Sequence, residues 1–245
     1  MKFTYQEYTG LIELLRSNGF TFERFQKSPT GRRKVYLRHD IDMSIEDALS
    51  LAALERDLDV NSTYYVMLDT ELYNVLTPGA VAMLRDMAGM GHDIGLHYVQ
   101  QNENYDARGY DENLITDISN QCDLLSRILE LDITSFSFHR PAPDILRKNI
   151  AVAGYSNAYV DPYFTPGAYI SDSNHHWRCG DPHAFINEFK GESLQVLTHP
   201  FWWNPESIDP GDKLISFVGH LKSSHQAALI RDVKLAQAVF ENSSG

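Results

Sequence analysis

The sequence predicts an α/β fold organised around a parallel sheet, and two observations support this class. Short runs of β-branched and aromatic residues alternate with amphipathic helical patterns over some seven rounds. No Gly-x-Gly-x-x-Gly and no Walker loop follows the first expected strand, which disfavours the nucleotide-binding Rossmann and P-loop folds. The alternation leaves open whether the sheet is flat or closed into a barrel.

The expected strands share a β-branched or aromatic character, and most of them end at a polar residue. They are 35–42, 62–67, 93–97, 134–138, 155–160, 168–171 and 194–198. The run 35–42 is the most informative, because it ends abruptly in Asp40 and Asp42 and a helical pattern begins just after Ser44.

The expected helices have apolar residues at helical spacing and recognisable ends. The first ends at Asn18-Gly19, the second is capped by Ser44, and the third begins at Pro78. They are 5–18, 44–58, 78–89, 113–131, 144–153, 182–190 and 213–241. We therefore predict a single domain over residues 1–245, with an N-terminal helical extension and C-terminal helices that pack on its outside.

Composition excludes several classes of protein. The net charge of −12 argues against a nucleic acid or an anionic membrane as partner, because both are polyanions. No apolar segment approaches the length of a membrane span, and the N-terminus lacks the apolar region of a signal peptide. Cys122 and Cys179 form neither a C-x-x-C motif nor a disulfide framework. These observations predict a cytoplasmic protein and give no prediction of its oligomeric state.

Polar residues follow the ends of the expected strands, where the mouth of a parallel barrel would lie. Asp40 and Asp42 end the first strand, His97 the third and His199 the last. Side chains alternate along a strand, so both carboxylates face the same way and repel each other unless a cation lies beside them. The alternative is that they are solvated turn and helix-cap residues. Together with the histidines, they predict a metal or acid–base site.

Four motifs in order give the chain a resemblance to the polysaccharide deacetylase superfamily (NodB-homology, carbohydrate esterase 4-like). Arg-His-Asp-Ile-Asp at 38–42 is similar to the first motif, in the His-Asp-Val-Asp form of a divergent subgroup. The other three are Gly-His-Asp-Ile-Gly-Leu-His at 91–97, Phe-His-Arg-Pro at 138–141 and Leu-Thr-His-Pro at 197–200. The resemblance implies an irregular (β/α)7 barrel, and the subgroup it suggests is associated with bacterial surface-polysaccharide biosynthesis.

The resemblance also implies roles for the residues that match these motifs. Asp40 would be the general base, and Arg140 would orient it through a bidentate ion pair. Asp42 and His97 would bind a divalent metal, expected to be zinc, with cobalt, nickel and manganese as alternatives. His199 would be the general acid that protonates the departing amine.

One departure from the family pattern concerns the metal. The second metal-binding histidine of the family lies four residues after the first, and here that position is Gln101. Because an amide ligates zinc poorly, three possibilities remain. His139 could fill the position from a neighbouring strand, Gln101, Asn102 or Asn104 could complete a weaker site, or the protein could be a metal-free pseudoenzyme.

Further residues are candidates for substrate binding. Trp202 and Tyr98 follow strand ends and could stack on a sugar ring or simply pack the barrel rim. Asp172 could contact substrate, hold a histidine in one tautomer or be a solvated loop residue.

The expected activity is that of a metal-dependent hydrolase. It would remove an acetyl or formyl group from the nitrogen of an amino sugar, or of a sugar precursor of surface polysaccharide. The alternatives are a metal-free sugar-binding pseudoenzyme and an amidohydrolase of a small non-sugar amide. In each case the expected partner is a small molecule or a carbohydrate.

Overall fold

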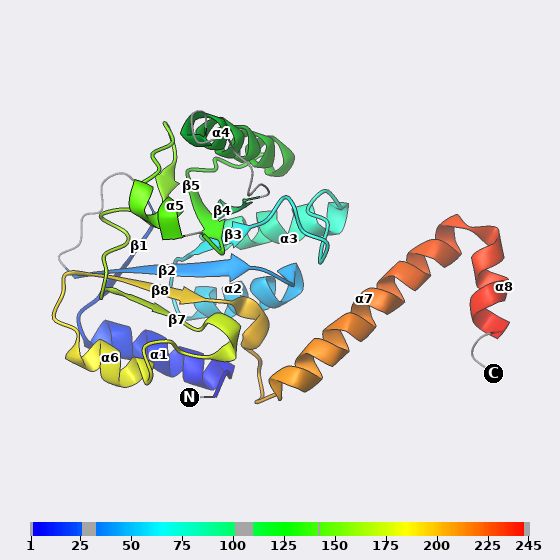
Figure 1. Ribbon diagram of the computed structural model, residues 1–245. Helices are drawn as coiled ribbons and strands as arrows, with labels where there is room; N and C mark the ends of the chain where they lie inside the picture. Colours follow the sequence, from blue (N-terminus) through cyan, green and yellow to red (C-terminus); the bar gives the residue numbers. More distant parts are fainter. Residues whose placement is uncertain (1, 26–32, 101–109, 142, 243–245) are drawn as a thin grey trace. The chain divides into compact units, whose positions relative to one another are not determined.

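The computed structural model describes residues 2–25, 33–100, 110–141 and 143–242 (Figure 1). The chain divides into two compact units, Met1–Glu206 and Ser207–Gly245. The first unit contains all the described strands and every motif discussed above, and the second is helical.

The first unit is built on one parallel sheet. Its strands are β1 (Thr21–Glu23), β2 (Lys34–Ile41), β3 (Thr63–Val66), β4 (Asp93–Val99), β5 (Ser135–His139), β6 (Ser156–Asn157), β7 (Tyr169–Ser171) and β8 (Ser193–Thr198). They are ordered β6-β5-β4-β3-β2-β8-β7, and β1 pairs with β2 outside this path. All seven expected strands are present, which confirms the α/β class.

The sheet forms an incompletely closed barrel. β2 and β8, the first and last of the seven expected strands, pair in register from Lys34↔Ser193 to His39↔Thr198. Within the described residues no pairing joins β6 to β7, the two ends of the path. The open seam of the curled sheet therefore lies between β6 and β7. This arrangement confirms the irregular barrel expected from the sequence.

Within the described residues of the first unit, six α-helices alternate with the strands, and several begin at the caps that the sequence predicts. Thr4 Oγ1 accepts a hydrogen bond from the Glu7 amide, and Ser44 Oγ accepts one from the Asp47 amide. Pro78 follows the cap Thr77 at a first-turn position. The helices are α1 (Tyr5–Ser17), α2 (Ile45–Asp57), α3 (Pro78–Gly89), α4 (Tyr110–Leu129), α5 (Pro143–Lys148) and α6 (Pro182–Glu188).

The two faces of the sheet differ in chemistry. The outward face packs against the helices in two apolar clusters, one including Leu96 and Phe136 and the other Leu37 and Val196. The inward face carries polar groups above a small aromatic cluster that contains Tyr36 and Tyr65. Strand alternation produces this division, because residues of β2 point to opposite sides in turn.

Gly95 makes room for one member of this aromatic cluster. A Cβ atom added at Gly95 would lie 2.5 Å from Cε1 of Tyr65, which is fully buried. Glycine at this point of β4 therefore allows the Tyr65 ring to fill the floor of the barrel beneath the polar groups.

The second unit consists of α7 (Pro210–Asp232) and α8 (Lys234–Asn242). The sequence predicts one helical stretch over 213–241, but Val233 has extended backbone angles (φ −127°, ψ 105°) and separates two helices. The packing of these helices on the outside of the barrel stays a prediction. No described helix is both long and apolar enough to cross a bilayer.

Candidate metal and acid–base site

A pocket of about 570 Å³ lies at the carboxyl ends of the strands. It brings together most of the residues that the sequence singles out. Its acidic and basic lining consists of Asp40, Asp42, His97, His139, Arg140, Arg178 and His199. Trp202 also lines the pocket, whereas Tyr98 and Asp172 do not.

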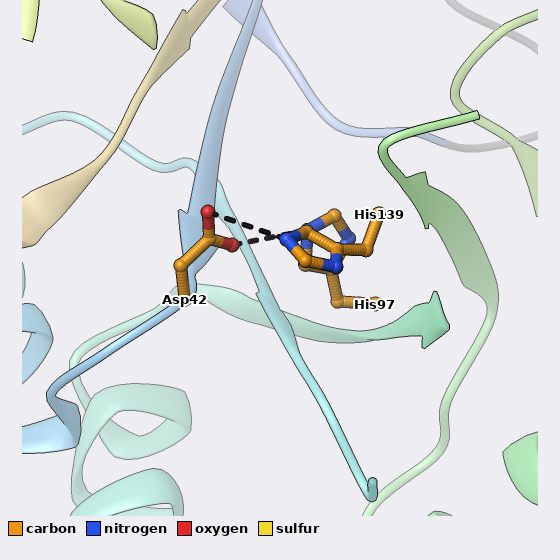
Figure 2. A group of neighbouring side chains, drawn as sticks. All are labelled: Asp42, His97 and His139. Carbon is orange, nitrogen blue, oxygen red and sulfur yellow. Dashed lines mark ion pairs between the residues drawn. The ribbon is translucent and has the colours of Figure 1, made fainter. Parts of the chain in front are cut away.

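Three side chains from β4, β5 and the end of β2 form a candidate metal site (Figure 2). The potential ligand atoms of Asp42, His97 and His139 all lie within 4.8 Å of one another. His97 Nε2 is 3.2 Å from Asp42 Oδ1, and His139 Nε2 is 3.8 Å from Asp42 Oδ2. Asp42 Oδ1 is buried and has no hydrogen-bond partner among the described residues. A cation would satisfy this oxygen, so the residues fit a metal.

The protonation states also suit metal binding. Burial raises the pKa of Asp42, but its hydrogen-bonding contact with His97 and the charge of His199 lower this pKa well below its usual range. Burial lowers the pKa of His139, which favours the neutral imidazole that can donate a lone pair to a metal.

Ser137 orients one of the candidate ligands and is a residue that the sequence analysis missed. The Nδ1 atom of His97 lies 2.7 Å from Ser137 Oγ, which leaves its Nε2 atom directed at the two aspartates. A hydrogen bond to the far nitrogen fixes the tautomer of a metal-binding histidine. Ser137 lies two residues before His139 on the same face of β5. This spacing could have predicted from the sequence that Ser137 lies near the candidate metal site.

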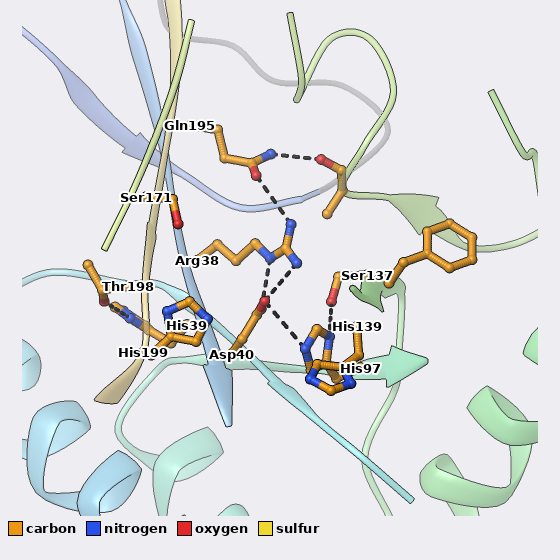
Figure 3. A network of polar contacts seen from close by, with 12 residues as sticks. Arg38, His39, Asp40, His97, Ser137, His139, Ser171, Gln195, Thr198 and His199 are labelled. Atoms are coloured by element: carbon orange, nitrogen blue, oxygen red, sulfur yellow. Dashed lines mark hydrogen bonds and ion pairs between the residues drawn. The ribbon is translucent and has the colours of Figure 1, made fainter. Parts of the chain in front are cut away.

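Asp40 is held by Arg38, and the expectation that Arg140 orients it is wrong. Arg38 donates from Nε to Asp40 Oδ1 and from Nη2 to Oδ2, both at 2.8 Å (Figure 3). Both side chains are buried. Burial raises the pKa of Asp40, but the charge of Arg38 outweighs it and the pKa is lowered. Arg38 makes this contact because it lies two residues before Asp40 on the same face of β2.

Arg140 nevertheless lines the pocket. It follows β5 directly, is exposed, and has a left-handed backbone conformation with φ 48°. No ion pair joins it to Asp40 in the described part of the chain.

Asp172 holds His199, as one of the alternatives for this residue predicts, and it does not line the pocket as a substrate contact would. The Asp172 carboxylate is fully buried and lies 2.6 Å from His199 Nδ1. It also accepts hydrogen bonds from the His199 amide and from Trp203 Nε1. Both carboxylate oxygens of Asp172 are therefore used in hydrogen bonds to His199 and Trp203. The second nitrogen of His199 faces the candidate metal site, 3.7 Å from Asp42 Oδ2.

The charge of Asp172 also sets the protonation of His199. Burial lowers the pKa of His199, but the charge and hydrogen bond of Asp172 raise it to about 9. His199 is therefore an imidazolium at neutral pH, with one N–H committed to Asp172 and the other turned toward the pocket.

Tyr98 does not contribute to the pocket either. It is buried, and its hydroxyl donates a hydrogen bond of 2.7 Å to Asp117 in α4. His97 faces the barrel interior, so its neighbour in β4 must face outward, toward the helices. His39 faces outward in the same way and lies against Glu55 and Thr198.

The alternative metal ligands Gln101, Asn102 and Asn104 lie outside the described residues.

Removing the charge of Asp172 should lower the pKa of His199. In metal-free Asp172→Asn protein, we expect an NMR titration of His199 to move from about 9 toward 6.5. The raised pKa stabilises the fold below pH 6.5, and this contribution is lost as the pH rises through about 9. The variant should lack this pH dependence. Asp161→Asn, at an exposed aspartate, is the matched control, and an unchanged His199 titration in Asp172→Asn would contradict the assignment.

Neither a protein-family model nor a curated protein matches the chain. Among solved structures, it is similar to the Streptococcus pyogenes deacetylase PplD in complex with acetate. The identity is 14%, with a TM-score of 0.44 over 58% of this chain and 66% of that one. The polysaccharide deacetylase Bc1974 from Bacillus cereus has 13% identity and a TM-score of 0.44, over 79% of this chain and 89% of that one.

A third similar structure is BA3943 from Bacillus anthracis, a CE4 family pseudoenzyme. The identity is 10%, with a TM-score of 0.44 over 80% of this chain and 63% of that one. The chain spans less than two thirds of the length of PplD and of BA3943. It is thus structurally similar, at low identity, both to deacetylases and to a pseudoenzyme.

Proposed function

We propose that this chain is a metal-dependent hydrolase that removes an N-acyl group from an amino sugar. One observation carries the proposal: Asp40, paired with Arg38, and His199, paired with Asp172, line the same pocket as the candidate metal site. A protein that only binds sugar needs no such acid–base pair. Amide hydrolysis needs both, because water must lose a proton and the departing nitrogen must gain one.

Each side chain has a defined task in this reaction. A divalent metal held by Asp42, His97 and His139 would supply Lewis acidity, which polarises the amide carbonyl and makes water a stronger acid. Asp40 accepts the proton of the attacking water, since Arg38 keeps its carboxylate ionised and fixed in orientation. His199 donates a proton from Nε2 to the leaving nitrogen, while its Nδ1 stays bound to Asp172.

The donor set favours zinc among the candidate metals. Two imidazoles and one carboxylate are ligands that zinc commonly takes in catalytic sites, where a further position is left for water or substrate.

The rest of the pocket suits a sugar. Its aromatic lining includes Tyr159, Phe164, Tyr169 and Trp202, which offer flat surfaces to the apolar faces of a sugar ring. Its volume of about 570 Å³ lies within the usual range of small-molecule sites. These features support a small acylated sugar, such as a precursor of a surface polysaccharide, in preference to a long polymer.

A release assay tests the proposal. Zinc-reconstituted protein is incubated with N-acetylated and N-formylated amino sugars and with N-acylated non-sugar amides, and the acid and free amine are quantified. We expect release from a sugar substrate, reduced at least ~100-fold in Asp40→Asn and His199→Gln. Release from the non-sugar amides alone would favour a small-amide hydrolase. Sugar binding without any release would favour the metal-free binding protein.

A further inference from the structure

Two arginines of the pocket have no assigned task in the reaction. Arg140 and Arg178 both line the pocket, and both are exposed. Neither has a carboxylate partner among the described residues, whereas Arg38 in the same barrel is fully paired with Asp40. The pocket therefore holds two uncompensated guanidinium charges in a chain whose net charge is −12. An acidic chain repels anions at long range, whereas these two positive charges favour the binding of an anion within the pocket.

The topology places the two arginines at strands near the open seam of the barrel. Arg140 directly follows β5, whose neighbour β6 forms one end of the sheet. The Arg178 amide donates a hydrogen bond to the carbonyl of Ser171, the last residue of β7, which forms the other end. The two arginines are therefore attached near the two ends of the strand order.

Aromatic rings bridge the same side of the pocket. Tyr159 follows β6, Tyr169 begins β7, and Phe164 lies between them with ring centroids 5.6 Å and 5.3 Å away. These rings give a sugar or a base a surface on which to stack, in the same pocket that the two arginines line.

We propose that Arg140 and Arg178 bind a phosphate group carried by the acylated amino sugar. This inference rests on the proposed function and names its substrate class. Guanidinium groups match phosphate oxygens in bidentate geometry, and a phosphate ester carries enough charge to neutralise both arginines. A carboxylate would neutralise only one of them, and a neutral polysaccharide neither. The phosphate can belong to a sugar phosphate or to a nucleoside diphosphate sugar.

The first test is independent of which sugar is bound. Pyrophosphate binding to zinc-reconstituted protein is measured by titration calorimetry for the wild type, Arg140→Gln, Arg178→Gln and the double variant. We expect each single variant to bind at least about tenfold more weakly, as is typical when a charge-assisted hydrogen bond is lost. The control is Arg56→Gln, which removes an exposed arginine that pairs with Asp57 and does not line the pocket. Equal affinity in the double variant and the wild type would overturn the proposal.

The second test uses the reaction itself. The kcat/KM for deacetylation is compared among N-acetylglucosamine 1-phosphate, UDP-N-acetylglucosamine and the neutral methyl glycoside of N-acetylglucosamine. We expect the wild type to prefer at least one phosphorylated substrate, and the ratio to the neutral glycoside to fall about tenfold or more in each arginine variant. The preferred phosphorylated substrate identifies the source of the phosphate.

The two tests separate this inference from the proposed function. If the neutral glycoside is hydrolysed as well as the phosphorylated sugars, the phosphate site is wrong while the hydrolase stands. If none is hydrolysed but pyrophosphate binding depends on both arginines, the anion site is supported and the proposed hydrolysis of these sugars fails.

Discussion

His97→Ala and His139→Ala are each expected to lose the bound metal and to reduce acyl release at least ~100-fold. The reason is geometric, because the two imidazoles and Asp42 supply the three ligand atoms that lie within 4.8 Å of one another. Each variant would leave only two of them. Loss of a mere supporting hydrogen bond costs roughly 10- to 100-fold in affinity, so loss of a ligand should cost more. Metal content is measured by elemental analysis after zinc reconstitution and dialysis.

The matched control is His176→Ala, which removes an exposed histidine. Ser137→Ala provides a graded case, since it removes only the partner of His97 Nδ1 and should weaken metal binding by roughly 10- to 100-fold. If His139→Ala retained stoichiometric zinc while His97→Ala lost it, a ligand from residues 101–104 would have to complete the site. If the wild type held no metal after reconstitution, the proposed hydrolase would be replaced by the pseudoenzyme alternative.

The fold could be predicted from the sequence because its signals are local. β-branched runs, the cap at Ser44 and the first-turn Pro78 fix where most elements begin, and alternation with helices fixes parallel pairing. The short strand β1 (Thr21–Glu23) was missed because three residues show no periodicity. The break at Val233 was missed because apolar spacing continues across it on both sides.

The position of His139 beside His97 depends on packing between strands. Motif spacing along the chain cannot show which side chain of a neighbouring strand comes close. In the structure, β4 and β5 pair with His97 opposite Ser137 and with Val99 opposite His139. This register brings His139 beside His97, with ring centroids 5.2 Å apart.

Other errors could have been avoided by applying strand alternation to every residue. Tyr98 must face away from His97, and Arg38 must share a face with Asp40. The family resemblance instead implied that Arg140 is the orienting arginine. For Asp172 the sequence left three alternatives open, and its burial against His199 and Trp203 appears only in three dimensions.

Helical spacing predicts that Glu55 lies on the buried face of α2, which is unusual for a carboxylate. It follows Ala48, Leu51 and Ala52 at the intervals that define the buried face of α2, and the structure places it at 0% exposure. Buried carboxylates are rare and need partners. Glu55 receives hydrogen bonds from Tyr8, Ser62 and Tyr64 at 2.5–2.7 Å, and His39 Nε2 lies 2.9 Å away. His39 also contacts Thr198, the residue before His199, so this network supports the strands that carry the site.

Glu55→Ala is therefore expected to lower the free energy of unfolding by roughly 3–5 kcal/mol, the usual cost of removing one partner from a buried ionic network. The substitution leaves three hydroxyls and an imidazole of the described network without their acceptor. Chemical denaturation measures the change. Asp57→Ala, on the same helix, removes an exposed carboxylate paired with Arg56, and its cost should stay below about 1 kcal/mol. Similar costs for the two variants would contradict the structural role of Glu55.

The pH dependence of the free energy of unfolding separates the contribution of the Glu55 charge from that of the packing of its side chain. Burial raises the pKa of Glu55, but the charge of His39 and hydrogen bonds from His39 and Ser62 lower it to about 2. Because the folded pKa lies below the unfolded value of 4.5, the ionised form stabilises the fold above pH 4.5, and this contribution is lost as the pH falls through about 2. Glu55→Gln keeps the shape but cannot titrate. The stability difference between wild type and Glu55→Gln should therefore shrink between pH 4.5 and 2, and a constant difference would mean that Glu55 is not ionised in the fold.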